Sequence, residues 1–296
     1  MIRIILQNKS EDKNFVAVQL QFCIFCKEII EKGVSFTEES KYFNLLIQSF
    51  SNAINSDDPQ IIYDFCHIIF TIFTYNINTC SLILDNLQFL DHSEQWVKLN
   101  DPKIFNIYLI IIAYLLSECS SLSSEYIEKI SSVVFYIFDS SSMIDNEDIK
   151  LSLGITLQNL ISINENFIAN FIDENRISLI CSNIIFCSFK VSKNYAYLYL
   201  LIASNIDDFS KVINEEIIEK ILGFMEKGKG EFVCNALHHF NLILEKQQIQ
   251  KKNDLLDAII KLDGVDLIND MMNSENEFIS EMSFNISSRY FPQYNN

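Results

Sequence analysis

Long apolar segments alternate with short polar breaks along the whole chain. Pro59 and Pro102 each follow an aspartate, in SDDPQ and NDPKI, and they lie 43 residues apart. Steps of 43 residues in both directions reach further short polar segments, near positions 16, 145, 188, 231 and 274. Such a regular recurrence of breaks is typical of a repeat protein.

Each break precedes a segment that is apolar at helical spacing, and proline in the first turn after an acidic residue is a helix start signal. The expected helices cover residues 15–31, 60–77, 103–118, 149–163, 194–206, 232–246 and 277–291. Further apolar segments lie upstream of the breaks, for example 42–54, 126–138 and 215–225. Ile- and Phe-rich runs such as 107–116 have strand propensity, but their length and the absence of hairpin turns favour helices.

The repeating unit is therefore two or three helices in about 40–47 residues, the size of armadillo and HEAT repeats. A single repeat of this kind cannot bury its own apolar face, so stacking of neighbours forms the core. We predict an all-α chain that forms one continuous right-handed α-solenoid of about seven armadillo-like repeats, with a period of about 43 residues. We expect residues 1–296 to be a single domain.

Composition narrows the possible functions. The chain has 296 residues, of which 49% are hydrophobic, and a formal net charge of −17. That apolar content argues against disorder, and the acidity argues against direct nucleic-acid binding, which needs Lys- and Arg-rich surfaces. The longest uninterrupted apolar run, 107–116, is half of the roughly 20 residues that a membrane span needs, and the N-terminus turns polar too early for a secretory signal. We expect a soluble intracellular protein that attracts basic partners.

The sequence contains no recognisable catalytic or metal-binding constellation. No phosphate-binding glycine motif, zinc-protease motif or nucleophile elbow occurs, and the chain has six glycines. Cys23 and Cys26 form a CxxC without a second pair nearby, and the adjacent His238 and His239 point in different directions on a helix. We expect neither an enzyme nor a cofactor nor a bound metal.

Three segments resemble the importin-alpha family of armadillo-repeat proteins. SDDPQIIYDFCHIIFTI resembles the acidic-Pro break and third helix of one of its repeats. SEDKNFVAVQLQFCIFCKEII resembles its first repeat. The most specific similarity is C-terminal, where ALHHFNLIL and then LDGVDLINDMMNSENEFISEMSFNISSRYF are similar to the end of the family's last repeat.

The resemblance implies an adaptor that binds basic nuclear localisation signals in a concave groove. In the family, the third helix of each repeat has a Trp that contacts a lysine stem and, four residues later, an Asn that binds the peptide backbone. The residues at the Trp position here are His67, Ile110, Ile155 and Leu201, and those at the Asn position are Thr71, Tyr114, Asn159 and Asn205. Glu118 lies near the family's acidic position, which receives the ammonium groups.

The resemblance also implies transport partners and places of action. These are basic segments of cargo proteins, importin-beta-like and exportin-like carriers, and both the cytoplasm and the nucleus. The chain departs from the family because its one Trp, Trp96, lies outside the third helices, and because it has about seven repeats where the family has about ten. Arg3, Lys9 and Lys13 are the only basic residues among the first twenty, so no importin-beta-binding segment is evident.

Two alternatives therefore stay open. The runner-up function is a non-enzymatic armadillo scaffold that has lost the signal-binding array and binds another protein partner. At the residue level, Asn159 and Asn205 either face a peptide groove or cap a helix and bond across repeats. Glu118 is either a peptide ligand or a solvated residue at a helix end.

Overall fold

The computed structural model describes residues 50–51, 53–75, 84, 88–119, 122–140, 145–228 and 230–294. The helix expected at 15–31, the Cys23–Cys26 motif and the basic residues near the N-terminus lie outside this part of the chain. All regular elements within it are helices, so the all-α prediction is confirmed. They belong to two compact units, of which the first ends at Leu160 and the second begins at Ile161.

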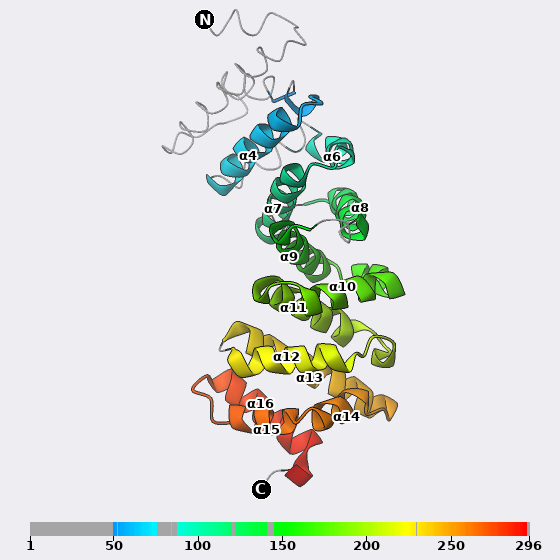
Figure 1. Ribbon diagram of the computed structural model, residues 1–296, viewed down its shortest axis with the longest axis vertical. Helices are drawn as coiled ribbons and strands as arrows, with labels where there is room; N and C mark the ends of the chain where they lie inside the picture. Colours follow the sequence, from blue (N-terminus) through cyan, green and yellow to red (C-terminus); the bar gives the residue numbers. More distant parts are fainter. Residues whose placement is uncertain are drawn as a thin grey trace, which may run out of the picture. The chain divides into compact units, whose positions relative to one another are not determined.

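In the first unit, two helices follow each other in each repeat that is described fully enough to see. The helices are α4 (Pro59–Tyr75), α6 (Phe89–Lys98), α7 (Pro102–Glu118), α8 (Ser124–Ser140) and α9 (Glu147–Ile163), whose last turn passes into the second unit. α4 packs against α7, and α6 packs against α8 (Figure 1). Corresponding helices of successive repeats are thus neighbours, as stacking of repeats requires.

The second unit has three helices per repeat. They are η2 (Glu165–Phe171), α10 (Glu174–Phe186) and α11 (Phe189–Asn205); then η3 (Phe209–Lys211), α12 (Glu215–Lys227) and α13 (Glu231–Gln250); then α14 (Asp254–Lys261), α15 (Gly264–Met271) and α16 (Glu277–Tyr290), followed by η4 (Pro292–Tyr294). α13 packs between α11 and α16 (Figure 1). A short first helix, a second helix and a long third helix is an armadillo-type arrangement. We call the last helix of each repeat its third helix, also where only two helices are described; these are α4, α7, α9, α11, α13 and α16.

Polar side chains in the breaks explain where the helices begin. Asp101 caps α7, since its Oδ1 accepts from the backbone N–H groups of Lys103 (2.8 Å) and Ile104 (3.4 Å), and Pro102 occupies the first turn. Asn146, Asn214 and Asn276 accept backbone N–H groups at the starts of α9, α12 and α16 in the same way. These side chains satisfy N–H groups that have no partner within a helix. The predicted breaks before α7, α9 and α16 therefore contain helix caps, whereas Ser188 before α11 and Gly230 before α13 make no side-chain cap bond.

Hydrogen bonds between neighbouring repeats show the period directly. Most of their partners are 41 to 47 residues apart, in pairs such as Trp96 with Ile54, Ser152 with Asn106, Gln250 with Asp207, and Arg289 with Glu245. The third helices begin 42 to 46 residues apart, at Pro59, Pro102, Glu147, Phe189, Glu231 and Glu277. The period predicted from the polar breaks is confirmed.

One helix start differs from the prediction by five residues. α11 begins at Phe189, whereas the expected helix began at residue 194. The segment SFKVSKN has a polar composition, but Val191 and Ser192 are buried on the inner face of α11, and the Ser192 hydroxyl donates to the carbonyl of Ile184. Packing of this turn against α10 therefore makes it helical, although most of its residues are polar.

Candidate functional site

The third helices are the elements on which the candidate peptide-binding residues lie. We call the places that match the family's Trp and Asn the register positions. In the first unit they lie on α4, α7 and α9. His67 is exposed and Thr71 is half-buried on α4, where the Thr71 hydroxyl donates to the carbonyl of His67 (2.9 Å). This hydrogen bond stays within one helical turn of α4.

On α7, the residue at the Asn position reaches the preceding repeat. Tyr114 donates its hydroxyl to the carbonyl of Phe73 on α4 (3.3 Å), and its ring packs edge-on against Phe70, with centroids 5.9 Å apart. Ile110, one turn earlier, is half-buried. Glu118 is exposed at the last residue of α7. The side chain of Tyr114 therefore has a structural role between α4 and α7.

On α9, Asn159 contacts the neighbouring helix, whereas Ile155 is exposed. Asn159 is half-buried, and its Nδ2 donates to the carbonyl of Ala113 on α7 (3.0 Å). Ile155 is 38% exposed, although it is a large aliphatic residue. Two further hydrogen bonds, from Ser152 to Asn106 and from Thr156 to the carbonyl of Leu109, join the same two helices. One N–H of the Asn159 amide is thus engaged across repeats.

In the second unit, the register positions lie on α11. Leu201 and Asn205 are both half-buried, and Asn205 Nδ2 donates to the carbonyl of Leu201 (2.9 Å). Asn205 is the last residue of α11, so this bond lies within the last turn of the helix. The Asn205 amide therefore closes its own helix end, while Asn159 joins two helices.

A buried polar contact between α11 and α13 was not predicted from the sequence. Ser204 Oγ and His239 Nδ1 are 2.8 Å apart, and both residues are buried. Burial, and to a smaller extent the neighbouring His238, lowers the pKa of His239 to about 4. The neutral imidazole is therefore the form that joins these two third helices. The sequence shows two adjacent histidines, but it does not show that Ser204 on α11 is the partner of His239.

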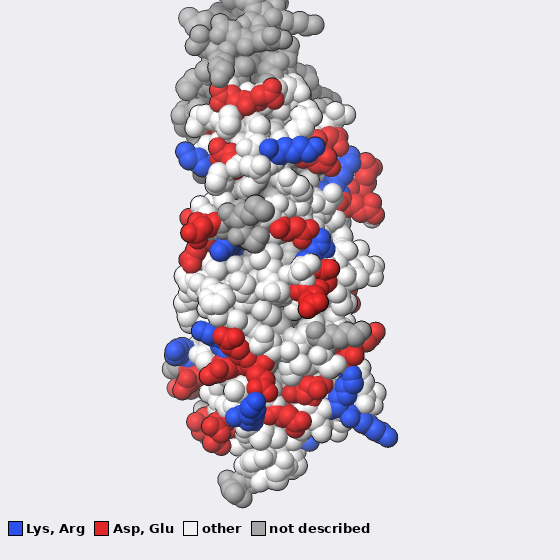
Figure 2. Space-filling view, turned by 45° about the vertical axis from the view of Figure 1, so that its right-hand side comes forward, with Lys and Arg blue, Asp and Glu red and all other residues white. Residues whose placement is uncertain are grey.

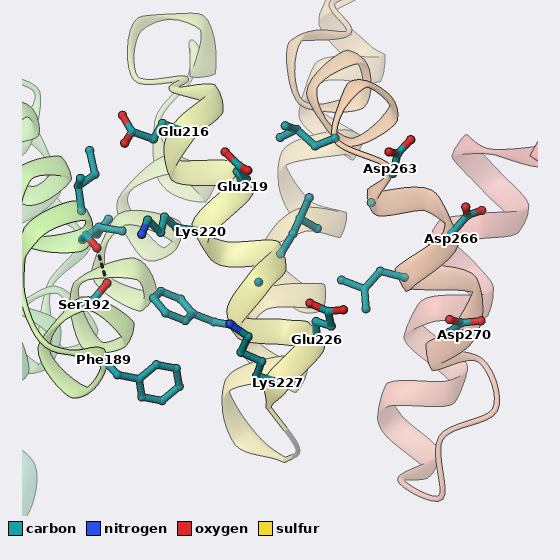
Figure 3. A pocket seen from close by; sticks show the side chains of 18 of the residues that line it. Phe189, Ser192, Glu216, Glu219, Lys220, Glu226, Lys227, Asp263, Asp266 and Asp270 are labelled. Atoms are coloured by element: carbon teal, nitrogen blue, oxygen red, sulfur yellow. Dashed lines mark hydrogen bonds between the residues drawn. The ribbon is translucent and has the colours of Figure 1, made fainter.

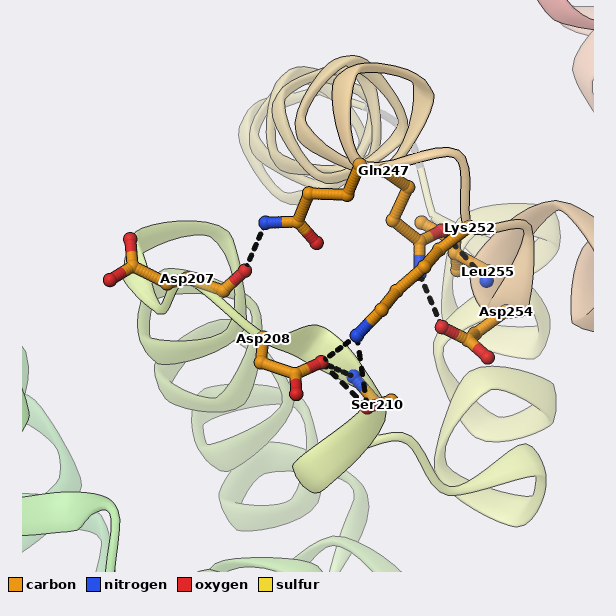
Figure 4. Close-up of polar contacts among 8 residues, drawn as sticks. Asp207, Asp208, Ser210, Gln247, Lys252, Asp254 and Leu255 are labelled. Atoms are coloured by element: carbon orange, nitrogen blue, oxygen red, sulfur yellow. Dashed lines mark hydrogen bonds and ion pairs between the residues drawn. The ribbon is translucent and has the colours of Figure 1, made fainter.

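Charged side chains at the repeat boundaries form a second set of contacts in this unit. Lys252 forms an ion pair with Asp208, and the hydrogen bond from Lys252 is the main reason why the pKa of Asp208 falls to about 2 (Figure 4). Lys261 pairs with Glu215, and Arg289 pairs with Glu245. Carboxylates nevertheless cover more of the face seen in Figure 2 than Lys and Arg do. Basic partners would be attracted to this surface.

The described segments lack the features of two other kinds of site. No group of three or more His, Cys, Asp and Glu side chains in this part of the chain is placed to hold a metal ion. No helix there combines the length and apolar character needed to cross a membrane. The third helices thus remain the candidate site.

The chain is similar to several solved structures of repeat proteins. A designed armadillo repeat protein, YIII(Dq)4CqI, superposes with a TM-score of 0.59 at 16% identity, over 79% of this chain and 95% of the designed one. The chain has an armadillo-like repeat fold. Two engineered proteins also superpose: target OR329 with a TM-score of 0.62 at 14% identity, over 80% of this chain and 93% of that one, and target OR497 with 0.64 at 13% identity, over 95% and 75%.

Comparisons by sequence add nothing further, since no family model and no curated protein matches the chain. The structural similarity lies below 25% identity and shows the fold alone. An armadillo-like fold is a repeat scaffold suited to protein binding, because stacked repeats create extended surfaces.

Proposed function

We propose that this protein is a non-enzymatic armadillo adaptor whose third helices bind an extended basic segment of a partner protein. In its full form, the proposal is that the segment is a nuclear localisation signal and that importin-beta-like and exportin-like carriers move the complex between cytoplasm and nucleus. The observation that carries the proposal is the recurrence of an apolar residue and, one turn later, a polar residue on successive third helices. Ile155 with Asn159 and Leu201 with Asn205 are the pairs nearest to the family pattern.

The physical basis is a combination of three contacts. Partly exposed aliphatic side chains such as Ile155 can pack against lysine stems. The carboxamides of Asn159 and Asn205 have further donor and acceptor positions beyond the one N–H that each already uses. The net charge of −17 attracts a lysine-rich segment and speeds its encounter with the protein.

A second function is favoured by a specific observation. The Nδ2 atoms of Asn159 and Asn205 already donate within the chain, so the amides serve the fold itself. In this alternative, the chain is a scaffold that has lost the signal-binding array and holds another protein partner. The two functions differ in whether binding depends on the order of residues in a basic peptide.

The test is equilibrium binding, by fluorescence anisotropy, of a lysine-rich localisation peptide and a scrambled peptide of equal composition at two salt concentrations. The adaptor function predicts tighter binding of the ordered signal, and a loss of about 1–3 kcal/mol in the Asn159→Ala, Asn205→Ala double variant. Equal and purely salt-sensitive binding of both peptides would support the scaffold instead.

A gain-of-function variant avoids the structural role of Asn159. Ile155→Trp and Leu201→Trp restore the family's aromatic residues at positions with solvent exposure. Each restored cation–π contact adds about 0.5–2 kcal/mol, which corresponds to roughly 2- to 30-fold tighter binding. Ile172→Trp is the matched control, because Ile172 is 48% exposed but lies outside the third helices. Equal tightening by the control variant would contradict the proposal.

A further inference from the structure

A groove in the second unit runs along α12, away from the register positions on the third helices. It has a volume of about 1000 Å³ and is bordered by the end of α10, the start of α11, and α15. Figure 3 shows the side chains that surround it, with α12 in the middle and α15 on one side. None of the candidate peptide-binding residues lines this groove.

The floor of the groove contains a gap at Gly223. A Cβ added there would meet no heavy atom within 4 Å, although Gly223 lies inside a 13-residue helix. Glycine destabilises a helix interior relative to alanine, and nothing in the described part of the chain requires its small size at this position. Its neighbours on the floor, Leu222 and Phe224, are buried and apolar. The gap therefore has room for an apolar side chain that the chain itself does not provide.

The rim of the groove is acidic. It has two lysines, Lys220 and Lys227, against six carboxylates: Glu216, Glu219, Glu226, Asp263, Asp266 and Asp270. Among the described residues, none of the six carboxylates forms an ion pair, whereas nearby Glu215 pairs with Lys261 across a repeat boundary. In Figure 3 the two lysines lie on the α11 side of α12, so the side toward α15 is lined by carboxylates. Repulsion between these groups opposes folding, and a cationic partner would relieve it.

An aromatic residue extends the apolar surface to the opposite rim. Phe189 packs edge-on against Phe224, with ring centroids 5.3 Å apart, and yet remains 56% exposed. An exposed aromatic beside an apolar floor is a typical anchor for a bound protein segment. The groove thus has an aromatic edge, an apolar gap and an acidic edge, in that order across α12.

We propose that this groove binds a basic amphipathic helix of a partner protein. An apolar side chain of that helix enters the gap above Gly223, its neighbours contact Phe189, and its Lys or Arg side chains face the carboxylates of α12 and α15. The stretch of α12 from Glu216 to Lys227 is about 16 Å long, which matches about three turns of a bound helix. This groove shares no residue with the third-helix site, and the proposal does not depend on the proposed function.

The probe is a fluorescent 18-residue peptide of Leu and Lys in which the leucines recur at helical spacing. Its control has the same composition with Leu and Lys in strict alternation, which removes the apolar face of the helix. The groove predicts tighter binding of the helical peptide to the full chain, and weaker binding as salt is added.

Gly223→Leu fills the gap and is the decisive variant. The added side chain points into open space and replaces a poor helix former, so the thermal midpoint of unfolding should not fall. Peptide binding should weaken by at least about tenfold, because the entering apolar side chain loses its place. Binding at wild-type strength to a folded Gly223→Leu protein would overturn the proposal.

Charge variants test the acidic rim separately. Asp266→Asn with Asp270→Asn should weaken binding about threefold to tenfold and reduce its salt dependence, since two surface charge contacts are lost. The matched control is Glu165→Gln with Glu174→Gln, which removes two exposed carboxylates at the starts of η2 and α10. If the control pair weakens binding as much as the rim pair does, the net charge alone explains it and the proposal fails. The Asn159→Ala, Asn205→Ala variant should bind this peptide like wild type.

Discussion

Buried polar side chains join neighbouring helices of the second unit by specific hydrogen bonds. Gln247 is 2% exposed, and its side chain spans two groups: Nε2 donates to Asp254 Oδ2 and Oε1 accepts from the backbone N–H of Leu255, both at 3.0 Å (Figure 4). It thereby caps α14, whose own N-cap residue Asn253 makes no side-chain cap bond. Such residues are costly to replace because their partners would stay buried without hydrogen bonds.

His239 differs from Gln247 because its contribution depends on pH. Its imidazole faces Ser204 at 2.8 Å, the ring of Tyr197 at 5.7 Å and the ring of His238 at 5.4 Å. Burial lowers its folded-state pKa to about 4, below the usual histidine value of 6.5. As pH falls below 6.5, the unfolded chain binds a proton that the folded chain does not yet accept, so the folded state loses stability until about pH 4.

We therefore predict that His239→Gln flattens the pH dependence of stability. The difference in the free energy of unfolding between wild type and variant should change by up to about 3 kcal/mol from pH 7 to pH 4, with the wild type losing more. Urea denaturation followed by circular dichroism at several pH values measures it. His67→Gln, a change at an exposed histidine, should leave the wild-type slope in place. A parallel shift of the His239→Gln curve at all pH values would contradict the assignment.

At the scale of the helices, two glycines on facing elements have opposite roles. Gly223 in α12 has open space beyond its Cα, whereas a Cβ on Gly264, at the start of α15, would lie 2.9 Å from Leu222 Cδ1 and 3.1 Å from Ile259 Cγ2. Gly264 thus permits close packing of α15 on α12 and α14. At Gly223, no close contact with another described helix requires a glycine.

The same substitution should consequently change stability in opposite directions. Gly223→Ala should raise the free energy of unfolding by about 1 kcal/mol, because alanine is the better helix former. Gly264→Ala should lower it by about 1–3 kcal/mol, because the added methyl group overfills the contact. Urea midpoints of the two variants, measured side by side, provide the comparison. Destabilisation by Gly223→Ala would mean that the space above α12 is already filled.

Helix positions were predictable to the extent that their signals are local. Asp101 and Pro102 lie beside the turn that they start, so the start of α7 could be predicted to within one residue. The early start of α11 could not, because Val191 and Ser192 stand in a mostly polar segment, and only their burial shows that this turn is helical. The register of Asn159 and Asn205 was visible, but not that one bonds across repeats and the other within its helix. Side-chain partners depend on packing that no local pattern encodes.

At the scale of the whole molecule, the excess of carboxylates opposes the folded state. The net charge of −17 adds repulsion that salt screens, while the exposed ion pairs that salt also weakens are worth little each. We predict that the thermal midpoint rises with NaCl, by about 2 °C for each kcal/mol of repulsion removed in a chain of this size. Differential scanning calorimetry from about 0.02 to 0.5 M NaCl covers Debye lengths from roughly 20 to 4 Å. A falling midpoint would mean that ion pairs such as Lys252 with Asp208 outweigh the repulsion.

The spacing of the hydrogen bonds between repeats also has a consequence for how the chain folds. Since partners are at most 47 residues apart, the separation of Thr156 and Leu109, each repeat needs just its neighbour to complete these bonds. The contact order of such a chain stays low however many repeats it has, and loop-closure entropy does not grow with length. Folding can nucleate at any adjacent pair of repeats, and an ancestor could gain or lose a whole repeat without disturbing those further away.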